Sequence, residues 1–428
     1  MVVSDIRSAS ALETAREELA GVRVEYSFGG HPPELLDGAD LLCLSGGVPA
    51  DLPLAQQALE RGIPLSNDSQ VFLEACAAPT IGITGSAGKT TTTALVGRMA
   101  QLHAHATGRH AWVGGNIGRS MLEDLDSIRP DDLVVMELSS FQLELMTRSP
   151  HIAAVLNITP NHLDRHKTMK AYASAKQRIL DYQSAQDLAV LGRDDPGAWR
   201  LADRVKGKRL TFGRDLSDAE DGAAIEANQV VIHNGGEAET ICRTEEIRLR
   251  GAHNQLNVAA ACAVALGAGI PAGEMRSAIL DFQGEPHRLQ LVRSFEGVDW
   301  YDDSIATTPE RAIAAITSFD EPIVLLAGGR DKDLDWDEFA HLVSARVDHL
   351  ILFGEAAKKI HKAMQAAGEP SPQYSLDICP NLQTAFEAAA RRAAPGDVVL
   401  LSPGGTSFDE FADFAARGDR YAEMVRAL

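Results

Sequence analysis

The chain has 428 residues, of which 45% are hydrophobic and 23% are charged, a composition typical of a folded soluble protein rather than a disordered or fibrous one. Its 40 Lys and Arg residues against 60 Asp and Glu residues give a net charge of −20, which disfavours general binding to nucleic acid or to an anionic membrane. The five cysteines are scattered without a close CxxC pair, and no apolar run approaches the ~18 residues of a membrane helix. We therefore expect a cytoplasmic protein of about three domains, without nucleic-acid or membrane partners. We take the protein to be a monomer, although composition and charge do not report the oligomeric state.

Short β-branched runs alternate with longer helical stretches along most of the chain, a pattern typical of parallel sheets with helices on their faces. The expected buried strands are 39–44, 81–84, 133–138, 152–156, 323–327, 349–353 and 398–401. The stretch 215–245 is rich in Asp, Glu, Asn and Gly and is predicted to form hairpins or an excursion from the sheet instead of βαβ units. Helices are expected after Gly251 and over 275–280. The predicted fold class is α/β.

Two breaks in this pattern suggest domain boundaries. The sequence Ala-Ala-Pro-Thr at 77–80 precedes the strand 81–84, and the residues before it make a small α/β unit. Residues 281–286, DFQGEP, end the helix 275–280 with Gly and Pro, and strands resume beyond them. We expect domains at 1–76, 77–283 and 284–428.

The segment 81–93, IGITGSAGKTTTT, runs from a strand through a glycine turn into a helix that Lys89 and Thr90 open. Backbone N–H groups around Gly85 and Gly88 can converge on an anion, Lys89 adds a positive charge, and Thr90 can offer a hydroxyl to Mg²⁺. The strict G-x-x-x-x-G-K-[ST] pattern is not met, because Ile83 stands at its first glycine. The order of strand, glycines, lysine and hydroxyl nevertheless favours a phosphate loop over a turn that only caps a helix.

Two later strand ends supply further polar groups. Glu137 ends the strand 133–138, and His162 follows the strand 152–156 within NITPNHLD. The carboxyl ends of parallel strands meet at one edge of a sheet, where α/β proteins bind ligands. A carboxylate suits Mg²⁺, whereas an imidazole suits it less, so His162 could instead bind substrate. With the phosphate loop, these residues favour a nucleotide and metal site.

Over nearly its whole length the chain resembles the Mur ligases, ATP-dependent amide-forming enzymes of peptidoglycan precursor synthesis. The family's ATP loop, central signatures and metal and substrate segment are matched by TGSAGKTTT (84–92), GGNIG (114–118), ELSSFQL (137–143) and NITPNHLDR (157–165). The member that adds glutamate to UDP-N-acetylmuramoyl-L-alanine is most similar at ELSSFQLE (137–144), GAHNQLN (251–257), PHR (286–288), LSPGGTSFD (401–409) and RGD (417–419). The resemblance implies a three-domain architecture: a shortened N-terminal α/β domain for the UDP-substrate, a central P-loop domain with a parallel sheet, and a Rossmann-like C-terminal domain for the amino acid.

The resemblance also implies roles for individual residues. The implied ATP site comprises Gly85, Gly88, Lys89, Thr90, Thr91, Asn254, Asn257, Arg288 and Asp303. The UDP-substrate is assigned to Asp5, Arg7, Ser45, Gly47, Asn116 and His162, and the incoming glutamate to Thr307, Lys332, Ser407 and Phe414. Two Mg²⁺ ions are assigned to Thr90, Glu137, His162 and Lys176, the last as a carbamate formed with CO₂. The implied catalytic set is Lys89, Glu137, His162 and Lys176.

These residue types suit amide formation from a carboxylate. A carboxylate is a poor acyl donor, so ATP converts it to an acyl phosphate while cations such as Lys89 and Mg²⁺ neutralise the transferring phosphoryl group. The amine of glutamate then attacks, and a base must take its proton, for which His162 is a candidate. In a protein of net charge −20, Lys332 can supply the cation that an acidic amino acid needs.

Three departures from the family pattern bear on the substrates. Family members usually begin with a strand and a glycine turn that would lie upstream of this chain's first residues. That element helps to hold the UDP moiety, so the departure concerns the affinity for UDP. Ile305 stands where the glutamate-adding enzymes commonly have lysine, and Arg330 where an acidic residue is often found, so Arg330 is expected to restore the charge. D-glutamate is therefore ranked first, with L-glutamate as the alternative.

Two other classes of protein share part of this pattern. Folylpolyglutamate synthase relatives share the phosphate loop, the modified lysine and glutamate addition, but SPGGTSFDEF and ELSSFQLE argue against them. A nucleotide-dependent binding or switch protein would hold ATP without ligase chemistry, and it would release no phosphate in response to glutamate.

Overall fold

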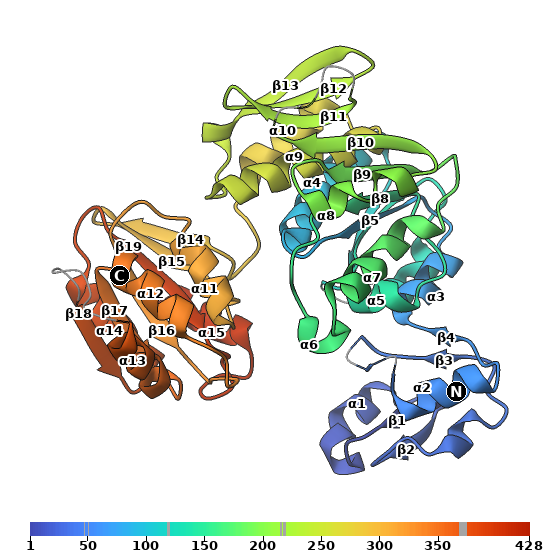
Figure 1. Cartoon of the computed structure of the whole chain (residues 1–428), viewed down its shortest axis with the longest axis horizontal. Helices are drawn as coiled ribbons and strands as arrows, with labels where there is room; N and C mark the ends of the chain where they lie inside the picture. Colours follow the sequence, from blue (N-terminus) through green and yellow to red (C-terminus); the bar gives the residue numbers. More distant parts are fainter. Residues whose placement is uncertain (47, 50, 118–119, 215, 217–219, 368–374) are drawn as a thin grey trace. The chain divides into compact units, whose positions relative to one another are not determined.

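The computed structural model describes residues 1–428 apart from 47, 50, 118–119, 215, 217–219 and 368–374. The chain forms two compact units (Figure 1). One comprises Met1–Ala224, Ile232–Glu239 and Ala260–Glu274, and the other Ile225–Val231, Thr240–Ala259 and Met275–Leu428. Within the described ranges, no helix combines the length and apolar character that a membrane span requires.

The N-terminal segment carries two small parallel sheets. Strand β1 (Val2–Asp5) pairs with β2 (Glu25–Phe28), and β3 (Leu42–Cys43) pairs with β4 (Leu65–Ser66). The helices are α1 (Glu13–Glu18), α2 (Pro53–Glu60) and α3 (Asp68–Ala75). The strand predicted at 39–44 is wrong in extent, because Gly38 has φ 77° and the amide of Ala39 bonds to Leu36 O at 3.2 Å, so a turn occupies its first residues.

The central sheet has nine strands in the order β13-β12-β11-β10-β9-β8-β5-β7-β6. Their bounds are β5 Thr80–Thr84, β6 Ala111–Gly115, β7 Leu133–Glu137, β8 Ile152–Val155, β9 Leu188–Gly192, β10 Lys208–Gly213, β11 Gly222–Glu226, β12 Gln229–Asn234 and β13 Glu237–Arg243. The helices are α4 Lys89–Thr107, α5 Ser140–Leu145, α6 Leu163–His166, α7 Met169–Asp181, α8 Pro196–Trp199, α9 Ala252–Gly267 and α10 Ala272–Asp281. From β6 across to β11 the strand pairs are parallel, as expected for βαβ units.

The hairpins predicted within 215–245 are confirmed for the described residues. Two-residue turns connect β11 to β12 and β12 to β13, the first at Ala227 and Asn228 (φ 44° and 61°) and the second at Gly235 and Gly236 (φ 63° and 86°). Positive φ at both turn residues matches the twist of a tight hairpin.

The C-terminal sheet has six strands in the order β14-β15-β19-β16-β17-β18, of which only the pair β14 and β15 is antiparallel. Their bounds are β14 Gln290–Phe295, β15 Val298–Asp302, β16 Ile323–Gly328, β17 His349–Phe353, β18 Ser375–Cys379 and β19 Val398–Gly404. The helices are α11 Pro309–Ile316, α12 Asp337–Arg346, α13 Ala357–Ala366, α14 Leu382–Arg392 and α15 Phe414–Arg426.

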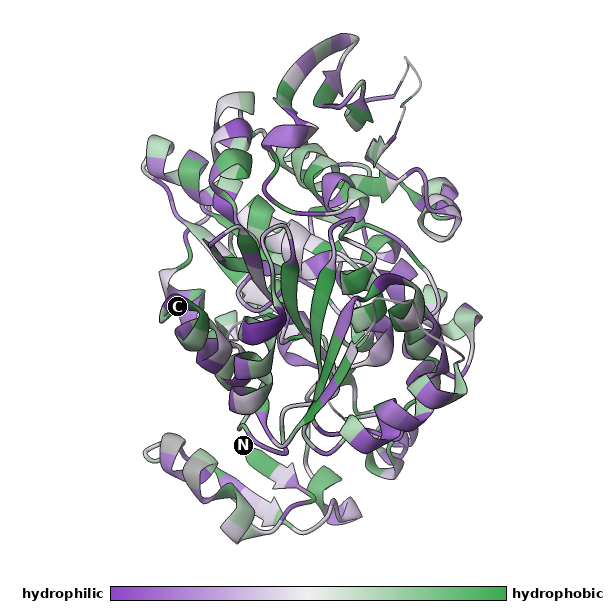
Figure 2. Cartoon of the chain, turned by 90° about the vertical axis from the view of Figure 1, so that its left-hand side faces the viewer, coloured by the Kyte–Doolittle hydropathy of each residue, from purple (hydrophilic) through white to green (hydrophobic). Residues whose placement is uncertain are grey.

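Both faces of this sheet are buried. Along β16, Ile323 and Leu325 belong to one apolar cluster, whereas Val324 and Leu326 belong to another. Successive side chains of a strand point to opposite faces, so a strand covered on both faces reads as a continuous apolar run. In Figure 2 the strands facing the viewer are mostly green, whereas purple gathers on helices and loops. The predicted α/β class is confirmed.

Candidate active site

The phosphate loop connects β5 to α4, the longest helix of the central sheet. Gly88 has φ 81° and lies directly before Lys89, where the helix begins. A Cβ on Gly85 would lie 2.9 Å from Leu156 Cβ, so the loop is packed too closely there for any side chain. Lys89 Nζ donates to Gly85 O at 2.9 Å, which holds the ammonium over the loop. Thr90 and Thr91 follow in the first helical turn, as predicted.

Side chains from distant parts of the sequence support this loop. Asn157 Oδ1 accepts from the Ala87 amide at 2.8 Å, and Asn157 O accepts from the Ser86 amide at 2.9 Å. Tyr172 OH donates to Ser86 Oγ at 2.9 Å, and Ser86 Oγ donates to Thr159 O at 2.9 Å. The sequence alone assigned no role to these residues, although Ser86, Asn157 and Thr159 lie in segments that resemble the family's motifs; Tyr172 lies outside those segments.

Lys176, on α7, is 1% exposed and lies against the loop. Its Nζ donates to Gly85 O at 2.8 Å and to Thr84 Oγ1 at 3.3 Å, so Lys89 and Lys176 share one carbonyl oxygen. Burial, together with the charge of Lys89, lowers the pKa of Lys176 to about 6, and Glu137 partly opposes this decrease. The neutral amine is therefore the main form of Lys176 at neutral pH.

Glu137 is the last residue of β7 and is 2% exposed. Its Oε1 accepts from Asn116 Nδ2 at 2.8 Å, whereas its buried Oε2 has no hydrogen-bond partner among the residues that the structure places. The adjoining backbone is tight, because a Cβ on Gly115, at φ 97°, would lie 2.4 Å from Glu137 O. A buried carboxylate oxygen without a donor is costly unless a cation meets it.

This oxygen fits a Mg²⁺ ion. In the part of the chain that the structure describes, no group of three or more His, Cys, Asp or Glu side chains is arranged to hold a metal by itself. Mg²⁺ commonly takes one or two carboxylates and completes its shell with water and substrate phosphates, which is the set that Glu137, Thr90 and a bound nucleotide would supply.

His162 is exposed at the start of α6, with φ 53°. Its ring meets the edge of Phe141 with centroids 5.2 Å apart, and Phe141 follows Glu137 by four residues. The neighbouring His166 is buried and bonds through Nε2 to Ser140 Oγ at 2.9 Å. His162 is thus next to α5, while Lys89, Glu137 and Lys176 gather at the ends of β5 and β7.

Asn254 and Asn257 lie in the first and second turns of α9 and bond to each other. Asn257 Nδ2 donates to Asn254 Oδ1 at 2.9 Å, and Asn254 Nδ2 donates to Arg250 O at 2.7 Å. Each keeps about a tenth of its surface exposed (8% and 9%).

Asp303, after β15, is almost fully buried next to Arg288. Its carboxylate accepts from Ser402 Oγ at 2.8 Å and from the Leu289 amide at 3.2 Å. Burial raises the pKa of Asp303 to about 7, and these hydrogen bonds and the charge of Arg288 oppose that rise. Arg288 Nε is buried without a partner among the described side chains, which leaves a donor for a ligand.

The predicted glutamate residues follow the carboxyl ends of three neighbouring parallel strands. Thr307 follows β15, Lys332 follows β16, Ser407 follows β19, and Phe414 begins α15. Lys332 is exposed, Ser407 is buried, and Thr307 and Phe414 are half-buried. They therefore belong to one edge of the C-terminal sheet.

Arg330 does not extend this set, because its exposed guanidinium pairs with Glu355 at 2.9 Å. Ile305 carries no positive charge, and Arg330 does not replace that charge with a free side chain, because its guanidinium is already paired with Glu355.

The predicted UDP-substrate residues of the N-terminal segment are solvent-accessible. Arg7 donates to Asp5 through its amide (2.8 Å), Nε (3.1 Å) and a terminal nitrogen (2.9 Å), and these hydrogen bonds lower the pKa of Asp5 to about 2. Ser45 is exposed after β3, and Gly47 lies outside the described residues.

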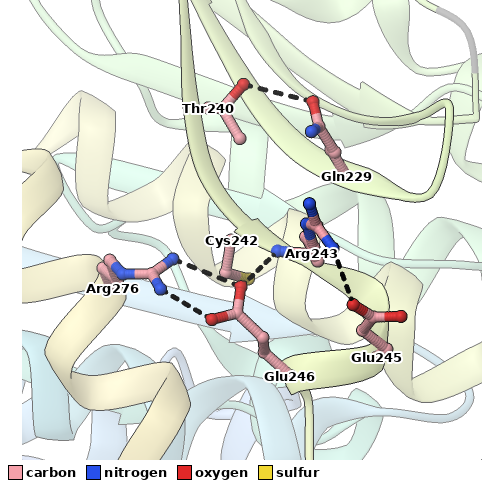
Figure 3. A pocket seen from close by; sticks show the side chains of 7 residues that line it. All are labelled: Gln229, Thr240, Cys242, Arg243, Glu245, Glu246 and Arg276. Carbon is pink, nitrogen blue, oxygen red and sulfur yellow. Dashed lines mark hydrogen bonds and ion pairs between the residues drawn. The ribbon is translucent and has the colours of Figure 1, made fainter.

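A polar pocket between β12, β13 and α10 contains none of the predicted site residues (Figure 3). Arg276 donates to Glu246 at 2.6 Å and to Ile241 O at 2.7 Å, and Arg243 pairs with Glu245 at 3.0 Å. Its charges are thus satisfied within the protein.

Two segments match families of known proteins. Residues 83–265 match the family described as Mur ligase middle domain, and residues 287–405 match the family described as Mur ligase, glutamate ligase domain. Both clusters of predicted side chains, around Lys89 and around Lys332, lie within these segments.

Curated relatives match along the whole chain. The UDP-N-acetylmuramoylalanine--D-glutamate ligase of Symbiobacterium thermophilum is 42% identical over 426 residues, which cover 99% of this chain and 92% of the relative. The protein of the same name from Acidobacterium capsulatum is 38% identical over 430 residues, covering 100% and 91%.

Solved structures share the fold. The MurF ligase from Thermotoga maritima in complex with ADP superposes with a TM-score of 0.61 at 18% identity, covering 100% of this chain and 94% of that one. The UDP-N-acetylmuramate-alanine ligase MurC from the same organism gives 0.60 at 19% identity, covering 100% and 93%.

Proposed function

The chain belongs to the Mur ligase family, and we propose that it joins D-glutamate to the carboxyl group of UDP-N-acetylmuramoyl-L-alanine while ATP is converted to ADP and phosphate. The observation that carries this proposal is the 42% identity, over 99% of the chain, to a relative named for that reaction. D-glutamate is the amino acid in the names of this and the other similar relatives, which favours it over L-glutamate. We place the reaction in the cytoplasm and take the enzyme to be a monomer.

The first step is activation of the substrate carboxylate. A carboxylate oxygen attacks the γ-phosphorus of ATP, ADP leaves, and an acyl phosphate forms. We infer that the loop amides around Gly85 and Gly88 bind the phosphates and that Lys89, now bonded to Gly85 O at 2.9 Å, neutralises charge on the transferring group. Glu137 and Thr90 would hold Mg²⁺, which when bound supplies further positive charge beside the phosphates.

Lys176 is suited to carbamate formation. Only a neutral amine attacks CO₂, giving a carbamate and releasing one proton. With a pKa of about 6, the amine is more than nine-tenths neutral at pH 7.5, against roughly one part in a thousand for a lysine of pKa 10.5. The carbamate would place anionic oxygens beside Glu137, next to the charge of Lys89, and we propose it as the third protein ligand for Mg²⁺.

The second step is amide formation. The nitrogen of glutamate attacks the acyl carbon, phosphate leaves, and a base accepts the amine proton. We assign glutamate to Thr307, Lys332, Ser407 and Phe414, and the UDP-substrate to Asn116, His162 and the N-terminal residues Asp5, Arg7, Ser45 and Gly47. His162 is the candidate base, since its exposed ring lies beside Phe141 with centroids 5.2 Å apart.

The remaining assignments concern the nucleotide and the domains. Asn254, Asn257, Arg288 and Asp303 are proposed to bind ATP together with the phosphate loop. We propose domain limits of 1–76, 77–283 and 284–428; the matched segments 83–265 and 287–405 lie inside the second and third of these.

A coupled assay of ADP release tests the function. ATP and Mg²⁺ are supplied with UDP-N-acetylmuramoyl-L-alanine and either D-glutamate or L-glutamate. We expect ADP release that requires both co-substrates and is faster with D-glutamate. Faster release with L-glutamate would identify the alternative ligase, and release indifferent to both co-substrates would identify a nucleotide-binding protein without ligase chemistry.

A further inference from the structure

Arg417, on α15, is an almost fully buried arginine for which the reaction outlined above has no role. It is 1% exposed and makes three hydrogen bonds to other segments. Nε donates to Ser304 Oγ at 2.9 Å, one terminal nitrogen to Ser304 O at 2.8 Å, and the other to Gly405 O at 3.1 Å. The last nitrogen also lies close to Gly329, where an added Cβ would be 2.8 Å from it.

The two segments to which Arg417 bonds and the third that lies close to it are those that carry the proposed glutamate residues. Ser304 precedes Thr307 after β15, Gly405 precedes Ser407 after β19, and Gly329 precedes Lys332 after β16. The fourth residue, Phe414, begins the helix that bears Arg417, and its carbonyl accepts from Ser304 Oγ at 2.8 Å. The guanidinium thus bonds to the segments after β15 and β19 and lies close to the segment after β16, and Ser304 links it to the start of α15.

The environment of Arg417 favours a cation with a planar set of donors. Burial lowers its pKa to about 10, and the charges of Asp409, Asp302, Glu410 and Asp303 oppose that decrease, so the group stays protonated at neutral pH. Its fixed fork can reach two carbonyls and a hydroxyl at once, which the single ammonium of lysine cannot do. The arginine therefore fixes the distances between three loop segments.

The next residue in the helix shows how closely α15 is held. A Cβ on Gly418 would lie 2.1 Å from His287 Nδ1 and 2.7 Å from Asp302 Oδ2, which are bonded to each other at 2.7 Å. The first turns of α15 therefore pack directly on the end of β15, with Arg417 reaching past it to the ends of β19 and β16.

We propose that Arg417 is a positioning residue of the glutamate site, setting the spacing of Thr307, Lys332, Ser407 and Phe414. This inference rests on the proposed function. It assigns to Arg417 an effect on glutamate binding. Asp303, the neighbour of Ser304 that is proposed to bind ATP, is held separately, because its carboxylate accepts from Ser402 Oγ and from the Leu289 amide.

The test compares Arg417→Met and Arg417→Lys with Arg420→Met as the matched control. Arg420 lies one turn further along α15, is exposed, and contacts Glu423 and Gln383 instead of the pocket segments. For Arg417→Met we expect the KM for D-glutamate to rise about tenfold or more while the KM for ATP stays within about twofold, because only the glutamate segments lose their spacer. Arg417→Lys should lie between wild type and Arg417→Met, and Arg420→Met should match wild type for both substrates.

A folded Arg417→Met enzyme whose KM for D-glutamate is within twofold of wild type would overturn the inference, as would equal increases for glutamate and ATP. Circular dichroism and thermal melting establish folding. If Arg417→Met does not fold, Ser304→Ala replaces it, because that change removes the hydroxyl between Arg417 Nε and Phe414 O and keeps the guanidinium. Its KM for D-glutamate is expected to rise about threefold or more, and an unchanged value would overturn the inference. Failure of the proposed function is recognised separately, as wild-type enzyme without glutamate-dependent ADP release.

Discussion

Replacing Lys176 with Met is expected to stabilise the folded chain at neutral pH while abolishing ligase activity. The unfolded chain keeps the Lys176 proton up to a pKa near 10.5, whereas the folded chain releases it above about pH 6. In this window the unfolded state binds more protons, so the stability of the wild-type chain rises with pH. Met is close to Lys in length and has no charge to lose, so it avoids this cost.

The pKa shift gives the size of the effect. At pH 7.5, holding a lysine of pKa 10.5 neutral costs about 4 kcal/mol, since each pH unit is worth about 1.4 kcal/mol. Loss of the hydrogen bonds to Gly85 O and Thr84 Oγ1 offsets about 1 to 2 kcal/mol of the gain. We expect Lys176→Met to be more stable by about 2 to 3 kcal/mol at pH 7.5, and this advantage to fall by roughly 2 to 3 kcal/mol at pH 9.5.

Urea unfolding at pH 7.5 and 9.5 measures the difference in stability between Lys176→Met and the wild-type chain. The buffer is depleted of CO₂ and contains a chelator, so that neither carbamate nor metal contributes. Lys170→Met is the control, because Lys170 lies on the same helix but is exposed. Its difference from wild type should be small at both pH values. A Lys176→Met difference that is the same at both pH values would refute the assignment of a neutral amine to this site.

Three other substitutions test separate parts of the structure. Lys89→Ala should abolish ADP release and leave the melting temperature within a few degrees of wild type, since its bonds to Gly85 O and Ser86 O stay within the loop; retained turnover would contradict its role. Gly115→Ala should destabilise the chain by about 1 to 3 kcal/mol, because φ is 97° and the Cβ would meet Glu137 O; denaturant unfolding equal to wild type would contradict this. His287→Gln should lose more stability at pH 6 than at pH 8.5, because the hydrogen bond to Asp302 raises the pKa of His287. The stability that the protonated His287 contributes is complete below pH 6.5 and disappears as the pH rises through the raised pKa. Equal losses of stability at the two pH values would contradict this.

The fold was predictable where burial is two-sided. The run 323–327 is apolar at every position, and the run 349–353 is apolar after His349, because each strand is covered on both faces, so their class and extent follow from composition. The run 39–44 is apolar apart from Asp40, yet only Leu42–Cys43 is a strand, because a local turn at Gly38 competes with pairing. Local backbone conformation of this kind leaves little trace in hydrophobicity.

The phosphate loop was predictable because its chemistry is contiguous, whereas its supports were not. Ser86 and Tyr172 are 86 residues apart, and Ala87 and Asn157 are 70 apart, so only the tertiary structure brings them together. The same holds for Arg417, which lies 113 residues from Ser304. An arginine in a helix reads as a solvated charge, and nothing in its neighbours signals that it is buried.

The two lysines at Gly85 give a physical argument for the carbamate that we propose at Lys176. Two ammonium groups bonded to one carbonyl oxygen repel each other, and the low pKa of Lys176 relieves that repulsion by removing one charge. A neutral amine, however, leaves Glu137 Oε2 without a partner among the described residues and adds no anionic ligand. Carbamate formation would give Lys176 a negative charge, so that it would attract Lys89 and, together with Glu137, would supply anionic oxygens suited to holding Mg²⁺. The burial that makes the Lys176 amine neutral is thus also what would make it reactive towards CO₂. Polar surroundings in place of this burial would remove both the neutral charge state and the reactivity.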